Sequence, residues 1–396
     1  MLRINNFLHR EQFSDLTRRW LHNQWRPTDL PLLKELINYN SLWLGRINRE
    51  ITHWLFSNLA QQNIHTRKVE TKGELKDLLV QNPPYVNDRI MHLVERYHRY
   101  PDRYFRETPF LGAVYAFQRD GKPAYLGSSR IKRVRRIAEK GARRIIDYIH
   151  SHLGAQANVN AGPSSGSWKQ PWSVAGESLI DEFERAERKL SADIQSGDLF
   201  DSHLEFVIED VLGLKVVVEP EQRRDVYELI EKDPQCEWVE IEHHRGHYNA
   251  TNLVIRYFPD REKLLSPPLS PEALERLKLR GMDPENAQQA FRRFVETGEP
   301  SIHIELILTH YEEMLESEIG RSMHEERLLR QRKQQSYRGH LARNVSYLME
   351  FIFAWGISPR TTISRLPIQV WNQYLPDYFD EVIKHLFQIP SFRELE

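Results

Sequence analysis

The chain has 396 residues, a length that accommodates two or three domains at ~100–200 residues each. Hydrophobic residues make up 40% of it and aromatic residues 11%, which excludes a wholly disordered chain because this composition supports a packed core. The 55 lysines and arginines nearly balance the 56 aspartates and glutamates, so net charge predicts neither a nucleic-acid partner nor a membrane partner.

The first hundred residues carry the apolar spacing of helices. Apolar side chains recur at intervals of three and four over 32–37 and 51–59, and a further helix is expected from Lys72 to the prolines at 83–84. This pattern predicts a helical supporting region.

Strand patterns begin at Pro109. Residues 111–117 and 123–126 flank an Asp120–Gly121 turn, which predicts a hairpin. A basic helix is expected from about 130 to 150.

The middle of the chain mixes all classes of structure. Residues 154–174 are rich in Gly, Ser, Asn and Pro and predict a flexible loop, followed by an amphipathic helix over 178–194. The strongest strand is expected over 206–218, with others over 238–241 and 250–257.

Helix signals then alternate with one more strand. Ser270 is expected to cap a helix that has a proline at its first position, and Asp283 to start another. A strand over 302–308 and a long helix over 311–332 follow. The irregular alternation predicts an α+β core flanked by helices.

The C-terminal residues 336–396 predict proline-separated helices. The most apolar run, 347–357, is about half a bilayer span and contains Glu350, so no membrane partner is expected. The first residues lack the apolar stretch of a signal peptide, and Cys236 is the single cysteine, which excludes an intramolecular disulfide and a Cys-rich zinc module. We therefore expect a cytoplasmic protein.

The densest charge cluster is 130–144, with eight basic residues and one acidic residue. Like charges at helical spacing repel, so an anion such as a polyphosphate or a nucleic-acid backbone would stabilise this run. The alternative is a solvated basic helix paired with acidic residues of 178–194.

Two carboxylates interrupt apolar strands. Asp210 lies within 206–218, where a carboxylate is costly unless it pairs with a cation such as Lys215 or binds a metal. In the strand over 302–308, alternation places Glu305 with His303 and Ile307 on one face, toward either solvent or a cleft.

An aromatic residue, Tyr248, precedes the strand over 250–257, where it can stack on a base or simply pack. The nearby His243, His244 and His247 do not predict a zinc site, because adjacent histidines on a strand point apart.

These segments together resemble the RelA/SpoT family of alarmone synthetases. The family has an Arg-x-Lys at a strand–helix junction and a further lysine ten residues after the arginine, which Arg130, Lys132 and Lys140 match. It has an aspartate followed five residues later by a basic residue, which Asp210 and Lys215 match.

Two further motifs extend the resemblance. The tyrosine of the family's strand entry is matched by Tyr248, with Asn252 where the family has histidine. The family's catalytic glutamate and the helix that follows it are matched without a gap by Glu305, Glu318, Gly320 and His324.

The resemblance implies an α+β fold with a nucleotidyltransferase-like mixed β-sheet core. This synthetase domain would occupy 109–330, with insertions at about 145–200 and 259–300, between helical regions at 1–108 and 331–396.

It also implies an ATP-dependent pyrophosphokinase that moves the β,γ-pyrophosphate of ATP to the 3′-hydroxyl of a guanine nucleotide, as in (p)ppGpp synthesis, with Mg²⁺ as cofactor. Asp210 and Glu305 would be catalytic and bind the metal, and Glu305 would accept the hydroxyl proton. The residues expected to hold ATP phosphates are Arg130, Lys132, Lys140 and Lys215, and those expected to hold the acceptor are Tyr248, Arg245 and Asn252.

Two alternatives stay open. Ile307 and Thr309 replace the family's Gln and Arg after the glutamate, which permits a toxin-type member that pyrophosphorylates adenine nucleotides or the tRNA 3′ end, with tRNA or an antitoxin-like protein as partner. The other alternative is a catalytically degenerate nucleotide-binding regulatory module. The chain has no His-Asp dipeptide, so the family's hydrolase domain is not expected.

Overall fold

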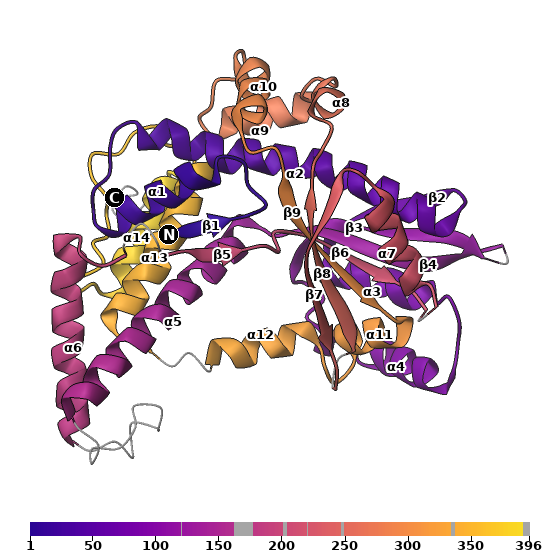
Figure 1. The fold of residues 1–396 in the computed structure, drawn as a ribbon, viewed down its shortest axis with the longest axis horizontal. Helices are drawn as coiled ribbons and strands as arrows, with labels where there is room; N and C mark the ends of the chain where they lie inside the picture. Colours follow the sequence, from indigo (N-terminus) through magenta and orange to yellow (C-terminus); the bar gives the residue numbers. More distant parts are fainter. Residues whose placement is uncertain are drawn as a thin grey trace.

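The computed structural model describes residues 1–119, 121–161, 177–200, 204–219, 221–246, 249–333 and 337–390. A seven-stranded sheet in the order β2-β3-β4-β6-β9-β8-β7 lies among helices (Figure 1). Neighbouring strands run antiparallel except β6 and β9, which are parallel, so the sheet is mixed. The predicted α+β class is confirmed.

The strands of this sheet come from most of the chain. They are β2 (Ile64–Thr71), β3 (Pro109–Arg119), β4 (Lys122–Ile131), β6 (Leu212–Val217), β7 (Cys236–His244), β8 (Ala250–Tyr257) and β9 (Ile302–Thr309). A separate parallel pair joins β1 (Leu2–Ile4) to β5 (Phe206–Ile208).

Helices cover both faces of the sheet. One face packs on α2 (Asp29–Ala60), and the other packs on α3 (Lys72–Gln81), which contacts α11 (Tyr311–Ile319) beside α4 (Asp88–Arg99). Strand alternation separates the two faces, because Leu214 and Leu306 belong to the core on the α2 side while Lys215 and Glu305 face the other way. The predicted alternation in β9 is therefore confirmed.

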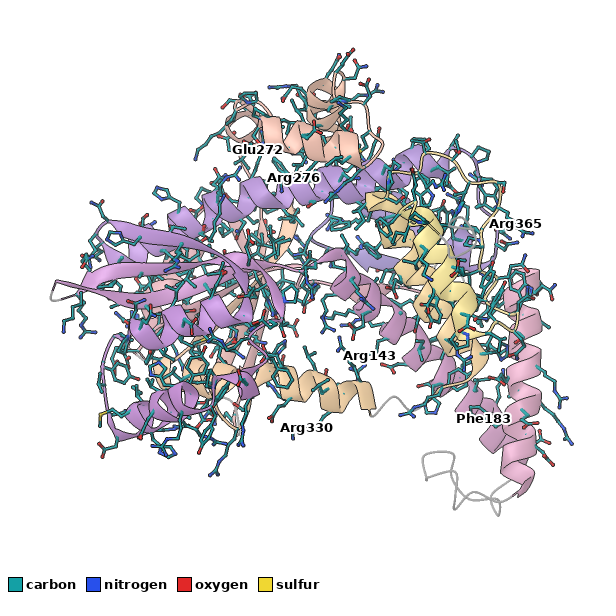
Figure 2. The ribbon with its side chains drawn as sticks, turned by 180° about the vertical axis from the view of Figure 1, so that it is seen from behind. Arg143, Phe183, Glu272, Arg276, Arg330 and Arg365 are labelled. Carbon is teal, nitrogen blue, oxygen red and sulfur yellow. The ribbon has the colours of Figure 1, made fainter. Side chains whose placement is uncertain are left out.

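The remaining helices form groups around this centre. A group on the outer side of α2 contains α8 (Arg261–Leu265), α9 (Pro271–Leu279) and α10 (Ala287–Thr297), and Figure 2 shows Glu272 and Arg276 of α9 there. A second group contains α1 (Arg10–Leu21), α5 (Val134–Ala161), α6 (Glu177–Ser196), α13 (His340–Ile357) and α14 (Pro376–Leu386). The short helices η1 (Pro101–Tyr104) and α7 (Arg223–Lys232) lie beside α4 and β7.

One helix joins the sheet to the second group. α12 (His324–Lys333) follows α11 and extends toward α5 (Figure 1). At its first turn, Glu325 pairs with Lys72 and Lys76 of α3, and at its other end Arg332 pairs with Glu139 of α5 at 2.7 Å. Both ends of α12 are thus attached.

Three predicted elements are divided or extended. The expected strand over 206–218 is wrong as one strand, because β1 pairs with β5 and the Asn6 side chain accepts from the Val211 N–H, which separates β5 from β6. The expected helix over 311–332 breaks at Gly320, where the Glu316 carboxylate accepts from the Arg321 N–H. The helices expected over 32–37 and 51–59 are one helix, α2.

Other boundaries shift by a few residues. The basic helix begins at Val134, so Arg130 belongs to β4. The expected loop over 154–174 is helical to Ala161, and its part at 162–174 lies outside the described residues. The helix expected from Asp283 begins at Ala287, and the region 1–108 contributes β1 and β2 besides helices.

The hydrophobic core is continuous across the predicted domain boundaries. One buried cluster contains Leu33 of α2, Leu306 of β9 and Val345 of α13. The boundaries at 108 and 330 stay a prediction. Within the described ranges, no helix is both long and apolar enough to cross a membrane.

The predicted helix cap at Ser270 is confirmed, since its hydroxyl accepts from the Ala273 N–H at 3.2 Å. We expect Ser270→Ala to lower the free energy of unfolding by about 1 kcal/mol, because that N–H loses its partner. Urea unfolding would measure the change. Ser270→Asp, which keeps an accepting oxygen, should restore most of it, and a Ser270→Ala variant as stable as wild type would contradict the role of the cap.

Candidate functional site

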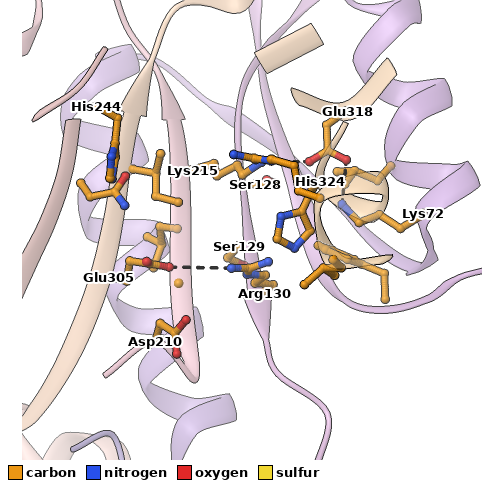
Figure 3. A pocket seen from close by; sticks show the side chains of 18 of the residues that line it. Lys72, Ser128, Ser129, Arg130, Asp210, Lys215, His244, Glu305, Glu318 and His324 are labelled. Atoms are coloured by element: carbon orange, nitrogen blue, oxygen red, sulfur yellow. Dashed lines mark hydrogen bonds and ion pairs between the residues drawn. The ribbon is translucent and has the colours of Figure 1, made fainter. Parts of the chain in front are cut away.

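A pocket of about 430 Å³ lies on the sheet face that carries Lys215 and Glu305 (Figure 3). Strands β4, β6, β8 and β9 form its wall, and α3 and α12 border it. Six of the nine predicted site residues line this pocket, which we call the first pocket: Arg130, Asp210, Lys215, Arg245, Asn252 and Glu305.

Strand register brings Arg130 to Glu305. Arg130 of β4 is opposite Gly213 of β6, and Gly213 is opposite Glu305 of β9. An added Cβ at Gly213 would lie 3.1 Å from Glu305 Oε2, so the absent side chain leaves room for the contact across β6. Arg130 Nη2 and Glu305 Oε2 are 3.8 Å apart (Figure 3).

Asp210 lies in the bend between β5 and β6, where two lysines meet it. Its Oδ2 pairs with Lys132 and, at 2.7 Å, with Lys140, while Lys132 also donates to the Asp210 carbonyl at 2.9 Å. Burial alone would raise the pKa of Asp210, but the charges of Lys132 and Lys140 hold this pKa well below 3.8. Burial and the charge of Arg130 lower the pKa of Lys132 to about 8.

The bend explains how Asp210 and Lys215 reach one site. Five residues separate them, so a continuous strand would point them to opposite faces. Because β6 begins only at Leu212, both side chains line the first pocket.

A buried carboxylate at one side of the pocket holds two lysines. Glu318, at the end of α11, pairs with Lys72 at 2.7 Å and Lys215 at 2.9 Å. Burial opposes its ionisation, yet Lys215, Lys72 and Lys76 hold the pKa of Glu318 well below 4.5. These two ion pairs of Glu318 hold the ammonium groups of Lys72 and Lys215 beside the pocket.

Sequence reasoning assigned no role to Lys72. Lys72 is the first residue of α3, in a region expected to be a helical support, and nothing in the sequence around it indicates a site residue. Glu318 and His324 belong to the motif that follows the family's catalytic glutamate. Both line the pocket because the helix ends at Gly320 and a new helix begins at His324.

Burial, together with the charges of Arg130, Lys72 and Lys215, lowers the pKa of His324 from 6.5 to about 2, although Glu318 raises it. The unfolded chain therefore binds a proton near pH 6.5 that the folded chain excludes, so stability falls as pH drops below 6.5. When the pH is lowered from about 7 to about 4, we expect the free energy of unfolding to fall less in His324→Gln than in wild type. Urea unfolding at each pH would measure it.

The exposed His92 of α4 provides the matched control for this comparison. His92→Gln should follow the wild-type pH dependence. Equal slopes for wild type and His324→Gln would contradict a neutral His324.

Three buried oxygens of the site accept no hydrogen bond from any residue that the structure describes: Asp210 Oδ1, Asn252 Oδ1 and Glu305 Oε2. Their three residues also line an adjoining cavity of about 390 Å³, the second pocket. Lys140 lines the second pocket, and Lys132 lines neither pocket but pairs with Asp210. The two pockets thus share a wall that carries these three oxygens.

This wall fits a divalent cation. Carboxylate oxygens are the ligands that Mg²⁺ prefers, and it usually takes one or two from the protein and the rest from water and phosphates. Among the described side chains, no group of three or more His, Cys, Asp and Glu is arranged to hold a metal. The two carboxylate oxygens of Asp210 and Glu305 that accept no hydrogen bond from a described residue match the smaller number of protein ligands that Mg²⁺ needs beside a nucleotide.

Of the histidines near Tyr248, His244 lines the first pocket (Figure 3). Tyr248 and His247 are outside the described residues. His243 contacts Thr251 at 3.1 Å, and His244 approaches Glu242 at 3.4 Å. In the basic helix, Arg135 pairs with Glu350 of α13 at 3.5 Å. Part of the positive charge of residues 130–144 is therefore neutralised by an acid that lies outside 178–194.

Comparison with known proteins identifies no relative. No protein-family model, no curated protein and no solved structure matches the chain. The resemblance to the RelA/SpoT family therefore stays a hypothesis, and the function must be argued from the geometry of the site.

Proposed function

We propose that the chain is an ATP-dependent nucleotide pyrophosphokinase whose sheet is of the nucleotidyltransferase kind. The observation that carries the proposal is the convergence of Asp210 and Glu305, from distant segments, on one pocket with Arg130 and Lys215. Transfer of a phosphoryl-type group needs positioning and charge neutralisation more than a covalent intermediate, and these residue types supply both.

The charge of the first pocket suits a polyphosphate. Five basic side chains line it, namely Lys72, Arg130, Lys215, Arg245 and Arg327, against the three carboxylates of Asp210, Glu305 and Glu318. A triphosphate would offset this excess of positive charge and accept charge-assisted hydrogen bonds from the arginines and lysines.

In the proposed reaction, the 3′-hydroxyl oxygen of the acceptor attacks the β-phosphorus of ATP. A bond forms between that oxygen and Pβ, the bond from Pβ to the bridging oxygen on Pα breaks, and AMP leaves with its electron pair. Glu305 takes the hydroxyl proton and later releases it to water. Arg130, 3.8 Å from Glu305, would lie beside the reacting phosphates and offset negative charge on their oxygens.

Asp210 and Glu305 would hold Mg²⁺ through Asp210 Oδ1 and Glu305 Oε2, which accept no hydrogen bond from a described residue. The bound ion would neutralise charge on the phosphate oxygens. Lys132 and Lys140 now neutralise Asp210, and phosphate groups at the site would give both lysines a second anionic partner.

The acceptor proposed first is a guanine nucleotide, which makes the product an alarmone of the (p)ppGpp type. Adenine nucleotides, the tRNA 3′ end and binding without transfer are the competing outcomes. Asn252 lines both pockets beside Glu305, so it is available to contact an acceptor.

The deciding experiment incubates the protein with Mg²⁺, ATP labelled in its γ-phosphate, and GDP, GTP, ADP or deacylated tRNA in turn. Label in a product of one acceptor, with AMP formed in equal amount, supports the proposal and names the acceptor. ATP binding with no transfer to any acceptor would overturn it in favour of a binding module.

A further inference from the structure

The second pocket lies beside the first on the same face of the sheet, toward the edge strand β7. Glu240 of β7 is opposite Val254 of β8, which is opposite Glu305 of β9. In the next row, Glu242 is opposite Asn252. Glu305 and Asn252 line both pockets, so the wall of the first pocket continues along the sheet into the second.

Several polar groups of the second pocket have no partner. Arg144 and Glu240 form no ion pair or side-chain hydrogen bond with any residue that the structure describes. The shared wall adds the buried oxygens of Asp210, Asn252 and Glu305, which accept no hydrogen bond from any described residue. Arg144 and Glu240 are exposed, so both are accessible to a ligand that also contacts this wall.

The basic side chains of this pocket come from α5, whereas its carboxylates come from β7, from β9 and from Glu209 and Asp210. Lys140 and Arg144 are four residues apart on α5 and therefore lie on one face of that helix. Glu240 and Glu242 line the pocket from β7. A ligand that matches both sides carries an anionic group at one end and N–H donors at the other.

We propose that the second pocket binds the acceptor, a nucleoside 5′-phosphate whose base carries an amino group. Lys140 and Arg144 bind its phosphates, and Glu240 and Glu242 accept hydrogen bonds from the amino group of its base. The inference rests on the proposed function in one respect, that the acceptor ribose lies at the shared wall.

This assignment divides the basic residues between two substrates. Arg130, Lys72 and Lys215 line the first pocket and contact the donor, whereas Lys140, expected from the resemblance to hold ATP, contacts the acceptor. Asp210 and Glu305 lie between the two ligands because both residues line both pockets.

The test measures binding without turnover. The full chain is saturated with Mg²⁺ and α,β-methylene-ATP, in which the bond to be broken is blocked, and then titrated calorimetrically with GDP, ADP, CDP, IDP or UDP. We expect one further nucleotide per chain, with an amino-bearing base preferred over IDP or UDP. Arg144→Ala should weaken this second binding by about tenfold, the loss of one charge-assisted contact, and leave the affinity for α,β-methylene-ATP unchanged.

Arg143 supplies the matched control, because it is on the same helix but lines neither pocket (Figure 2). Arg143→Ala should bind both nucleotides as wild type does. Glu240→Gln combined with Glu242→Gln should reduce the preference for amino-bearing bases and keep the second binding event.

Two outcomes would overturn the assignment: a saturated protein that binds no second nucleotide, or an Arg144→Ala variant that weakens α,β-methylene-ATP and acceptor equally. Failure of the proposed reaction can be distinguished from failure of the proposed acceptor pocket. A second nucleotide bound in the predicted way without any transfer keeps the pocket and removes the reaction, whereas transfer with an unchanged acceptor KM in Arg144→Ala keeps the reaction and removes the pocket.

Discussion

Glu305→Gln is expected to lower the rate of pyrophosphate transfer by at least about 100-fold, the low end for loss of a general base. Glutamine keeps the shape of the side chain but cannot take the hydroxyl proton. It also removes the negative charge that faces Arg130 at 3.8 Å and one of the two carboxylates proposed to hold Mg²⁺. The loss should therefore appear in kcat.

Single-turnover formation of AMP from saturating ATP and acceptor would measure this rate. Binding of ATP, measured separately, should survive, because the basic side chains of the first pocket are unchanged. Glu326→Gln, an exposed change on α12, is the matched control and should keep the wild-type rate. A wild-type rate in Glu305→Gln would remove this carboxylate from the mechanism.

Glu318→Ala is expected to lower the free energy of unfolding by about 3–5 kcal/mol, the cost of breaking a buried ion pair by removal of one partner. The Glu318 side chain is 1% exposed, and it is the anion between Lys72 and Lys215. Its loss leaves two ammonium groups beside each other without their shared counter-charge. Denaturant unfolding would measure the change.

Two comparisons isolate the buried pair from a general effect of removing a glutamate. Glu326→Ala removes an exposed ion pair with Arg330 on α12 and should cost at most about 1 kcal/mol. Adding Lys72→Met to Glu318→Ala should recover part of the loss, because one uncompensated charge is removed. Equal stability of Glu318→Ala and Glu326→Ala would contradict the role given to the buried pair.

Local sequence patterns predicted much of what is local in the structure. Alternation in β9 placed Glu305 on the face opposite the apolar core, and the cap at Ser270 follows from the hydrogen-bonding capacity of one residue. Motif spacing also selected six of the residues that line the first pocket, but it gave no sign that Lys140 lines the second pocket and Arg130 the first.

What sequence reasoning missed depends on distant partners. The apolar run over 206–218 gave no sign of its interruption, because the partner that separates β5 is β1, two hundred residues away in the chain. Lys72 becomes a site residue only through Glu318, which no pattern around residue 72 could reveal. The break at Gly320 likewise depends on a side chain of the preceding turn, Glu316.

The attachment of α12 at both ends has a mechanical consequence. Glu325 ties its beginning to α3, Arg332 ties its end to α5, and the stretch between them, through Arg327 and Gln331, borders the first pocket. α12 therefore connects two parts of the molecule, and it can move away from the first pocket only if one of these ion pairs breaks or the two parts move together. A displacement of the helices around α5 would be passed along α12 to the place where the triphosphate is proposed to bind.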